Sequence, residues 1–215
     1  MRFVDRVDAG RQLAAKLIDL RGESDLVALG IPRGGVVVGY EIALALGAPF
    51  DVALSRKLGA PDNEELAIGA LAENGSRILD EALIRHLRVP PEYIDRETEQ
   101  QQREIVRRAT LYRGERKPIE VRERLVVVID DGVATGSTMI VTLRALREKG
   151  ARTLIAAAPV AAAEAMSRLR WMADRVVAVH APDFFASVGS FYDHFEQVSD
   201  AEVRELLADL AATRP

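Results

Sequence analysis

Residues 125–138 read Leu125-Val126-Val127-Val128-Ile129-Asp130-Asp131-Gly132-Val133-Ala134-Thr135-Gly136-Ser137-Thr138. The first five are apolar and mostly β-branched, which predicts a parallel strand buried on both faces. Two carboxylates and a loop of small residues follow, and apolar residues then recur at helical spacing from Met139 to Leu146. We therefore expect a strand, an acid pair, a loop and a helix start to meet at one point.

Two residue types mark the limits of this helix. Ser137 or Thr138 can cap its start, because a hydroxyl oxygen accepts a hydrogen bond from a free amide of the first turn. Gly150 stands where a left-handed C-terminal cap is expected. The helix is thus predicted to follow the loop directly.

The loop between strand and helix has the composition of an anion site. Unpaired amides and the helix dipole attract a phosphate, and Gly132 and Gly136 let the backbone approach it closely. The hydroxyls of Thr135, Ser137 and Thr138 add donors. Because adjacent carboxylates repel a phosphate, the acid pair must face sugar hydroxyls, a cation, or both. The ligand indicated is a phosphorylated sugar.

This string resembles the signature of the type I phosphoribosyltransferases, which bind 5-phosphoribosyl 1-pyrophosphate (PRPP) with Mg²⁺ and move its ribose phosphate onto a nitrogen. The resemblance implies that Asp130 and Asp131 lie beside the ribose hydroxyls and are the candidates for metal contact, although the sequence identifies no direct metal ligand. It further implies that the 5-phosphate is held by Val133, Ala134, Thr135, Gly136, Ser137 and Thr138. An ordinary acid pair before a capped helix is the alternative.

A second group of residues is Gly30-Ile31-Pro32-Arg33-Gly34-Gly35, at the end of another predicted strand. Glycines after an arginine allow a backbone path with amides turned toward an anion, and Arg33 can bind a phosphate in bidentate fashion. In the resembling family, the loop at this place holds pyrophosphate, which implies that role for Arg33, Gly34 and Gly35. A tight turn after a strand is the alternative.

Arg56 and Lys57 form a third group, predicted to end the strand over 51–57 at the same edge of the sheet. Two cations there would oppose the acid pair and meet a pyrophosphate leaving group. The resemblance therefore implies a catalytic set of Asp130, Asp131, Lys57 and Arg33, with Arg56 as a further pyrophosphate ligand. The loop from Leu58 to Leu66 is expected to be mobile, and it lacks the lysine or arginine that other family members carry there.

Base recognition in this family lies near the C-terminus. Phe184, Phe185 and Tyr192 belong to the densest aromatic stretch of the chain and are candidates for stacking on a base. Packing of these rings into the core is the alternative.

Along the chain, strands alternate with helices, which predicts a doubly wound, mostly parallel α/β sheet. The expected organisation is a single domain over 1–215, with a core over 25–180, a helical insertion over about 80–118 and a small C-terminal hood over about 181–215. Outside the central motif, the sequence predicts helices over 8–20, 36–46, 91–113, 161–173 and 200–210, and strands over 25–31, 51–57, 67–72, 77–79, 153–160 and 175–180.

Composition limits the partners. The chain has 215 residues, a net charge of -4 and no cysteine, so neither a basic nucleic-acid surface nor a disulfide or thiolate metal site is expected. No apolar run is long enough to cross a bilayer. We expect a cytoplasmic protein without membrane or nucleic-acid partners, and the resemblance implies that homodimers can form.

The resulting prediction is a pentosyltransferase of nucleotide metabolism. It would move 5-phosphoribosyl from PRPP to a nitrogen acceptor, a nucleobase in most of the family, and release pyrophosphate with Mg²⁺ as cofactor. A regulatory protein that binds PRPP without turnover is the main alternative, and a domain that uses a phosphosugar in another way is the third. The sequence does not identify the acceptor.

Overall fold

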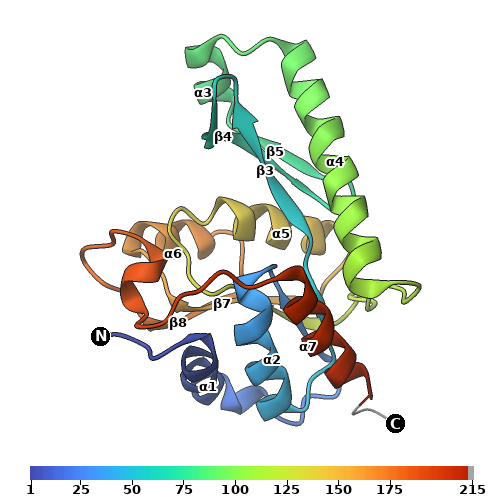
Figure 1. Ribbon diagram of the computed structural model, residues 1–215, viewed down its shortest axis with the longest axis vertical. Helices are drawn as coiled ribbons and strands as arrows, with labels where there is room; N and C mark the ends of the chain where they lie inside the picture. The colour runs from blue at the N-terminus through green and yellow to red at the C-terminus, as the bar shows by residue number, and fades with distance from the viewer. Residues whose placement is uncertain (213–215) are drawn as a thin grey trace.

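The computed structural model describes residues 1–212, apart from the side chains at 64, 65 and 212. A parallel five-stranded sheet in the order β2-β1-β6-β7-β8 forms its centre (Figure 1). The strands are β1 Leu26–Gly30, β2 Phe50–Val52, β6 Leu125–Ile129, β7 Thr153–Val160 and β8 Arg175–His180. The doubly wound fold class is confirmed. The end of the expected hood, 213–215, lies outside the described residues.

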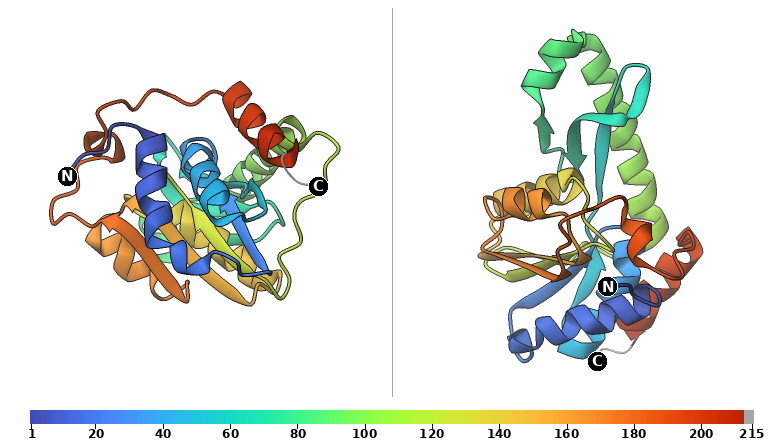
Figure 2. Two further views of the ribbon diagram at one scale, coloured as in Figure 1. Left: turned by 90° about the horizontal axis from the view of Figure 1, so that it is seen from below. Right: turned by 90° about the vertical axis from the view of Figure 1, so that its left-hand side faces the viewer.

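Helices cover both faces of this sheet, as the two further views show (Figure 2). One face carries α1 Arg6–Lys16, the short η1 Ile18–Leu20, α2 Gly34–Leu46 and α7 Asp200–Ala212. The other carries α5 Ser137–Glu148 and α6 Ala163–Leu169. The helix predicted over 161–173 is therefore shorter at both ends. Among the described residues, no helix combines the length and apolar character needed to cross a membrane.

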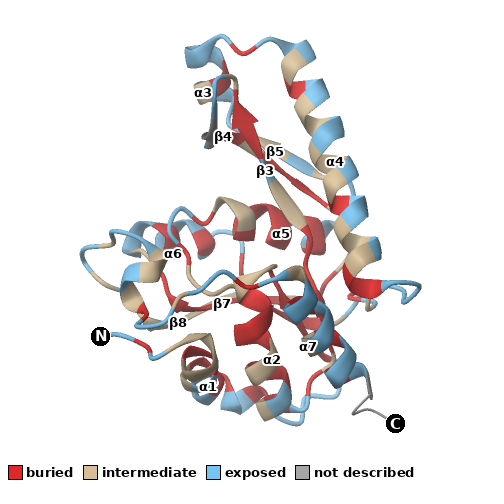
Figure 3. Cartoon of the chain, viewed as in Figure 1, coloured by how far each residue is buried: buried red, intermediate tan, exposed pale blue. Residues whose placement is uncertain are grey.

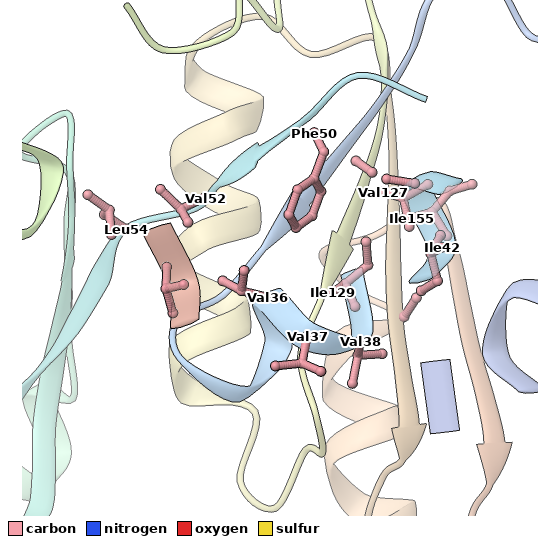
Figure 4. Close-up of a cluster of buried hydrophobic side chains, with 14 of the residues drawn as sticks. Val36, Val37, Val38, Ile42, Phe50, Val52, Leu54, Val127, Ile129 and Ile155 are labelled. Atoms are coloured by element: carbon pink, nitrogen blue, oxygen red, sulfur yellow. The ribbon is translucent and has the colours of Figure 1, made fainter. Parts of the chain in front are cut away.

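Strand β6 shows why the apolar run folds this way. Val127 and Ile129 pack with α2 on one face, whereas Val126 and Val128 pack with α5 on the other. Successive side chains of a strand point to opposite faces, so a strand between two helical layers must be apolar throughout. Figure 4 shows the α2 side of this core, where Val36 and Ile42 lie in the same cluster as the strand residues.

An arm, defined as residues 55–113, projects from the core beside α5 (Figures 1 and 2). It contains an antiparallel sheet and two helices. Its elements are β3 Ser55–Ala60, β4 Asn63–Ala72, β5 Arg77–Leu79, α3 Glu81–Leu87 and α4 Pro91–Arg113. The helix predicted over 91–113 is confirmed, and one side of it is exposed (Figure 3). The chain leaves the parallel sheet at Ser55, well before the expected insertion boundary near residue 80.

The strand predicted over 51–57 is wrong, because it is split between two sheets. Phe50–Val52 pairs with β1, and Ser55 starts the antiparallel sheet opposite Ala72. The sequence hides this break because Val52-Ala53-Leu54 is an uninterrupted apolar run.

The mobile loop expected from Leu58 to Leu66 is also wrong, since β3 and β4 form a hairpin. The glycines that indicated a loop have other uses. Strand pairing shifts register at Gly59, as at a β-bulge. A Cβ atom at Gly69 would lie 2.5 Å from the carbonyl oxygen of Ile78, so only glycine fits there.

A buried ion network joins the arm to the core. The Arg113 side chain is 5% exposed, and its Nε lies 2.9 Å from both carboxylate oxygens of Asp51 on β2. Its Nη1 donates to Glu73 (2.5 Å) and its Nη2 to the carbonyl of Val52 (2.8 Å). The end of α4, the β4–β5 turn and the edge of the parallel sheet therefore meet at one side chain.

We predict that Arg113→Ala lowers the free energy of unfolding by about 3–5 kcal/mol, because it leaves the Asp51 carboxylate buried without its partner. Urea denaturation measures this loss. The matched control is Arg107→Ala, which removes an arginine of α4 that is 55% exposed and paired with Glu104, and should cost far less because solvent screens this pair. Equal losses in the two variants would contradict the assigned role of Arg113.

Candidate active site

The carboxyl ends of β1 and β6 lie side by side. Their parallel register pairs Gly30 with Ile129, and the amide of Ile31 donates to the carbonyl of Ile129 (2.8 Å). The loop after β1 and the acid pair after β6 therefore begin at the same point. Doubly wound proteins bind ligands beyond this edge of the sheet.

Asp130 and Asp131 form a largely buried pair at this edge. The backbone amide of Asp131 donates to Oδ1 of Asp130 (2.9 Å). Burial, together with the neighbouring Asp131 carboxylate, raises the pKa of Asp130 well above its usual range. Burial also raises the pKa of Asp131, although the guanidinium of Arg6 acts in the opposite direction. A ligand that offers hydroxyl groups or a cation would offset the cost of these charges.

Arg6 and Tyr192 both contact Asp131, and the sequence revealed neither contact. Arg6 Nε lies 2.8 Å from Asp131 Oδ2, and the Tyr192 hydroxyl donates to the carbonyl of Asp131. Burial and the nearby Asp131 raise the pKa of Tyr192. These partners come from the two ends of the chain, so no local pattern could have indicated them.

The loop with Arg33 packs directly on the acid pair. A Cβ atom at Gly34 would lie 1.8 Å from Asp131 Oδ2, and one at Gly35 would lie 2.6 Å from the carbonyl oxygen of Ile129. Both positions therefore require glycine because of close approach. The peptide bond between Pro32 and Arg33 is cis.

The Arg33 side chain points toward α4 and α7. Its Nη1 lies 4.0 Å from Asp200 Oδ1, and the same oxygen accepts a hydrogen bond from the Tyr112 hydroxyl (2.5 Å). Burial and this hydrogen bond raise the pKa of Tyr112 to about 12. Arg33 is 30% exposed, so its guanidinium remains within reach of a ligand.

The loop from Val133 to Thr138 is fixed at its start and open at its end. Val133 exchanges backbone hydrogen bonds of 2.9 Å with Val160 and Ala162, after β7. Gly136 adopts a left-handed φ of 78° and is itself the N-cap of α5. The predicted cap by Ser137 or Thr138 is wrong: no side chain caps this helix, and Thr135 Oγ1 lies 3.5 Å from the Ser137 amide.

An uncapped helix start leaves amides available to an anion. Donors surround it: the Thr135 and Ser137 hydroxyl oxygens lie 3.3 Å apart. Arg168 of α6, which the sequence did not reveal, donates from Nη1 to the carbonyl of Thr135 (3.1 Å) and adds positive charge beside the loop. This geometry suits a phosphate.

Arg56 and Lys57 are not at the end of a core strand, contrary to the sequence prediction. They lie in β3, where successive side chains alternate between faces. Arg56 Nε donates to Gln101 of α4 (2.8 Å), away from the acid pair. Lys57 shares a face with Ser55, whose hydroxyl lies 2.9 Å from that of Thr142 on α5. Lys57 is therefore on the face of β3 that looks toward α5.

The structure separates the three aromatic residues expected to bind a base. Tyr192 is 2% exposed, its ring packs against Phe3 and Phe195, and it is therefore not available for stacking, contrary to expectation. Phe185 packs against Phe191, with 5.2 Å between the ring centroids. Phe184 is 82% exposed and thus accessible.

The fold is that of a phosphoribosyl transferase domain. The sequence model that represents this family, the phosphoribosyl transferase domain, matches residues 4–195, and the chain belongs to the family. Two proteins named as candidate phosphoribosyl transferases, from Mycobacterium tuberculosis strains CDC 1551 and H37Rv, are each 41% identical over 201 residues. The match covers 94% of this chain and 45% of each relative, so the chain spans about half of their length.

A solved structure covers the whole fold. The crystal structure of TT1426 from Thermus thermophilus has a TM-score of 0.83 and 42% identity, and the match covers 98% of this chain and 99% of that one. The arm and the segment after β8, residues 181–212, therefore belong to the fold that the chain shares with TT1426. We call residues 181–212 the C-terminal segment.

The buried acid pair should reduce the stability of the protein without ligand. Because the folded-state pKa of Asp130 is raised, the folded state loses stability as the pH rises from the ordinary value of 3.8 through that raised pKa. We predict that Asp130→Asn raises Tm at pH 7 and raises it less near pH 4, while its amide oxygen still accepts from Asp131. Thermal denaturation across pH measures this difference.

The control for this measurement is Asp183→Asn, at an exposed position of the C-terminal segment. Its Tm should differ little from that of the unsubstituted protein at either pH. A lower Tm for Asp130→Asn at pH 7 would show that the buried charge does not destabilise the fold.

Proposed function

We propose that the domain binds PRPP at the edge formed by β1 and β6 and transfers its 5-phosphoribosyl group to a nitrogen acceptor, with release of pyrophosphate. The observation that carries this proposal is the uncapped start of α5 directly behind a buried acid pair. The start of the helix attracts a phosphate, and the acid pair attracts sugar hydroxyls or positive charge. Membership of the family supports the same ligand.

In this proposal, the 5-phosphate occupies the loop from Val133 to Thr138. Asp130 and Asp131 face the ribose, and Arg33, Gly34 and Gly35 take the pyrophosphate. Lys57 remains a proposed pyrophosphate ligand because it is on the face of β3 that looks toward α5. Arg56 is not assigned to the pyrophosphate because its side chain contacts Gln101 of α4. Phe184 and Phe185 remain the candidates for contact with a nucleobase, the acceptor class expected of the family.

The reaction is a substitution at the anomeric carbon. The bond from this carbon to the pyrophosphate oxygen breaks, a bond to the acceptor nitrogen forms, pyrophosphate leaves with the electron pair, and the nitrogen loses a proton. Positive charge develops on the ribose ring, where the two carboxylates would stabilise it. Arg33 and Lys57 would stabilise the charge on the leaving group.

Mg²⁺ fits this arrangement as a partner of the substrate. It prefers oxygen ligands and binds in many enzymes through one or two carboxylates and the substrate phosphates. Asp130 and Asp131 are the residues that would hold it, because they supply adjacent carboxylates at the end of β6. When bound, Mg²⁺ would supply charge neutralisation to pyrophosphate.

We predict that Gly136→Val abolishes detectable PRPP binding at millimolar ligand, because a β-branched residue disfavours the left-handed φ of 78° and crowds the phosphate loop. Calorimetry measures the binding. The matched control is Gly47→Val, which has a similar φ of 67° at the far end of α2 and should lose stability but keep PRPP affinity. A folded Gly136→Val protein with unchanged affinity would contradict the assigned phosphate loop.

We further predict that the protein releases pyrophosphate from PRPP when an acceptor base is present. Asp130→Asn should slow this release about 100-fold or more while PRPP still binds, because its charge matters most where the ribose becomes positive. A pyrophosphatase-coupled assay measures the release of pyrophosphate, and calorimetry measures the binding of PRPP. A protein that binds PRPP but releases none with any base in a broad panel would instead be a PRPP-binding regulator.

A further inference from the structure

Arg6 has unusual surroundings for the first residue of a helix. Its side chain is 11% exposed, and its Nε lies 2.8 Å from Asp131 Oδ2. Its Nη1 donates to the carbonyl of Glu196 (2.8 Å), and its guanidinium carbon lies 3.8 Å from the centre of the Phe195 ring. An ion pair, a hydrogen bond and a cation–π contact therefore hold the Arg6 guanidinium. Each contact is made with a residue far away in the sequence.

The same ion pair supports the loop proposed for pyrophosphate. A Cβ atom at Gly34 would lie 1.8 Å from Asp131 Oδ2 and 2.7 Å from Arg6 Nε, so the loop rests on both partners. Tyr192 adds a hydrogen bond from its hydroxyl to the carbonyl of Asp131. The start of α1, the loop after β1, the end of β6 and the C-terminal segment thus converge on the Arg6–Asp131 pair.

The pair also makes the two acids unequal. Asp131 has one carboxylate oxygen engaged by Arg6, whereas Oδ1 of Asp130 accepts only from a backbone amide in the contacts described above. A guanidinium holds a carboxylate in a defined orientation, because its N–H donors are fixed in one plane. Arg6 also offsets part of the repulsion between two adjacent carboxylates.

We propose that Arg6 is a positioning residue of the sugar-phosphate site. It orients Asp131 and, through the same contact, keeps the loop of Arg33 and the C-terminal segment in place around the acid pair. We assign this role to the two contacts of its Nε and Nη1 atoms, which donate to Asp131 and to the carbonyl of Glu196. This inference rests on the proposed function for the identity of the ligand.

A double-mutant cycle between Arg6 and Asp131 tests the inference. The variants are Arg6→Gln, Asp131→Asn and the double variant, each measured for PRPP affinity, pyrophosphate release and Tm. If Arg6 acts through Asp131, Arg6→Gln lowers affinity or release at least 10-fold in the unsubstituted protein and less than 2-fold in the Asp131→Asn background. Equal losses in both backgrounds would overturn the proposal, because Arg6 would then act as a structural tie alone.

Two further variants separate positioning from stability. Arg6→Lys keeps a charged donor for Asp131 but loses the planar guanidinium, so it should recover part of the activity lost in Arg6→Gln. No recovery in a folded Arg6→Lys protein would count against the proposal. If Arg6→Gln does not fold, the cycle is run with Arg6→Lys, whose loss should again be larger in the unsubstituted protein than in the Asp131→Asn background; equal losses would overturn the proposal. Arg11→Gln removes an exposed arginine of α1 that pairs with Glu41 of α2, and should leave affinity and release unchanged.

The Tm values distinguish failure of this inference from failure of the proposed function. If the unsubstituted protein binds no PRPP, the proposed function is wrong. The Tm cycle still reports whether positions 6 and 131 are coupled, and additive changes in Tm would show that the ion pair does not hold Asp131. We expect the changes in Tm and the changes in PRPP affinity both to be non-additive in the double variant.

Discussion

The in-register pairing of β1 with β6 is the constraint on which the rest of the structure depends. With Gly30 opposite Ile129, the segments that follow the two strands must share one small volume. A Cβ atom at Gly34 would meet the Asp131 carboxylate, and one at Gly35 would meet the backbone of Ile129 and Asp130. The glycines of the first loop are therefore a steric consequence of how closely the chain passes over the end of β6.

Two arginines, Arg113 buried and Arg6 largely buried, attach the outer segments to this sheet. Arg113 joins the arm to Asp51 at one edge, and Arg6 joins both ends of the chain to Asp131 at the carboxyl end. In each case the carboxylate belongs to a strand or follows one directly, and the arginine comes from a helix. Breaking such a pair is more costly than its formation is favourable, because a buried charge is left behind. The pairs therefore specify how the segments are placed more than they add to overall stability.

Periodicity predicted the elements that lie between clear boundaries. Strands β6, β7 and β8 and helix α4 have the predicted limits, because charged residues, Gly or Pro stand next to most of their ends. Arg56 and Lys57 were misplaced because a continuous apolar run concealed the change of sheet after Val52. The site contacts of Arg6, Tyr192 and Arg168 could not be predicted at all, since they join residues that no local spacing relates. The loop proposed to bind phosphate could be chosen as a candidate because strand, acids, loop and helix are consecutive in the chain.

Asp200 gives the site a built-in competitor. Its carboxylate lies 4.0 Å from the guanidinium of Arg33 and also accepts from Tyr112, so Arg33 already has an anionic neighbour before any ligand arrives. An anion that takes Arg33 must exchange with this carboxylate, and only the difference between the two interactions contributes to its affinity. A singly charged anion gains little from such an exchange, whereas a polyanion gains much more. Discrimination in favour of highly charged ligands would thus arise from α7, a helix outside the loops that touch the ligand.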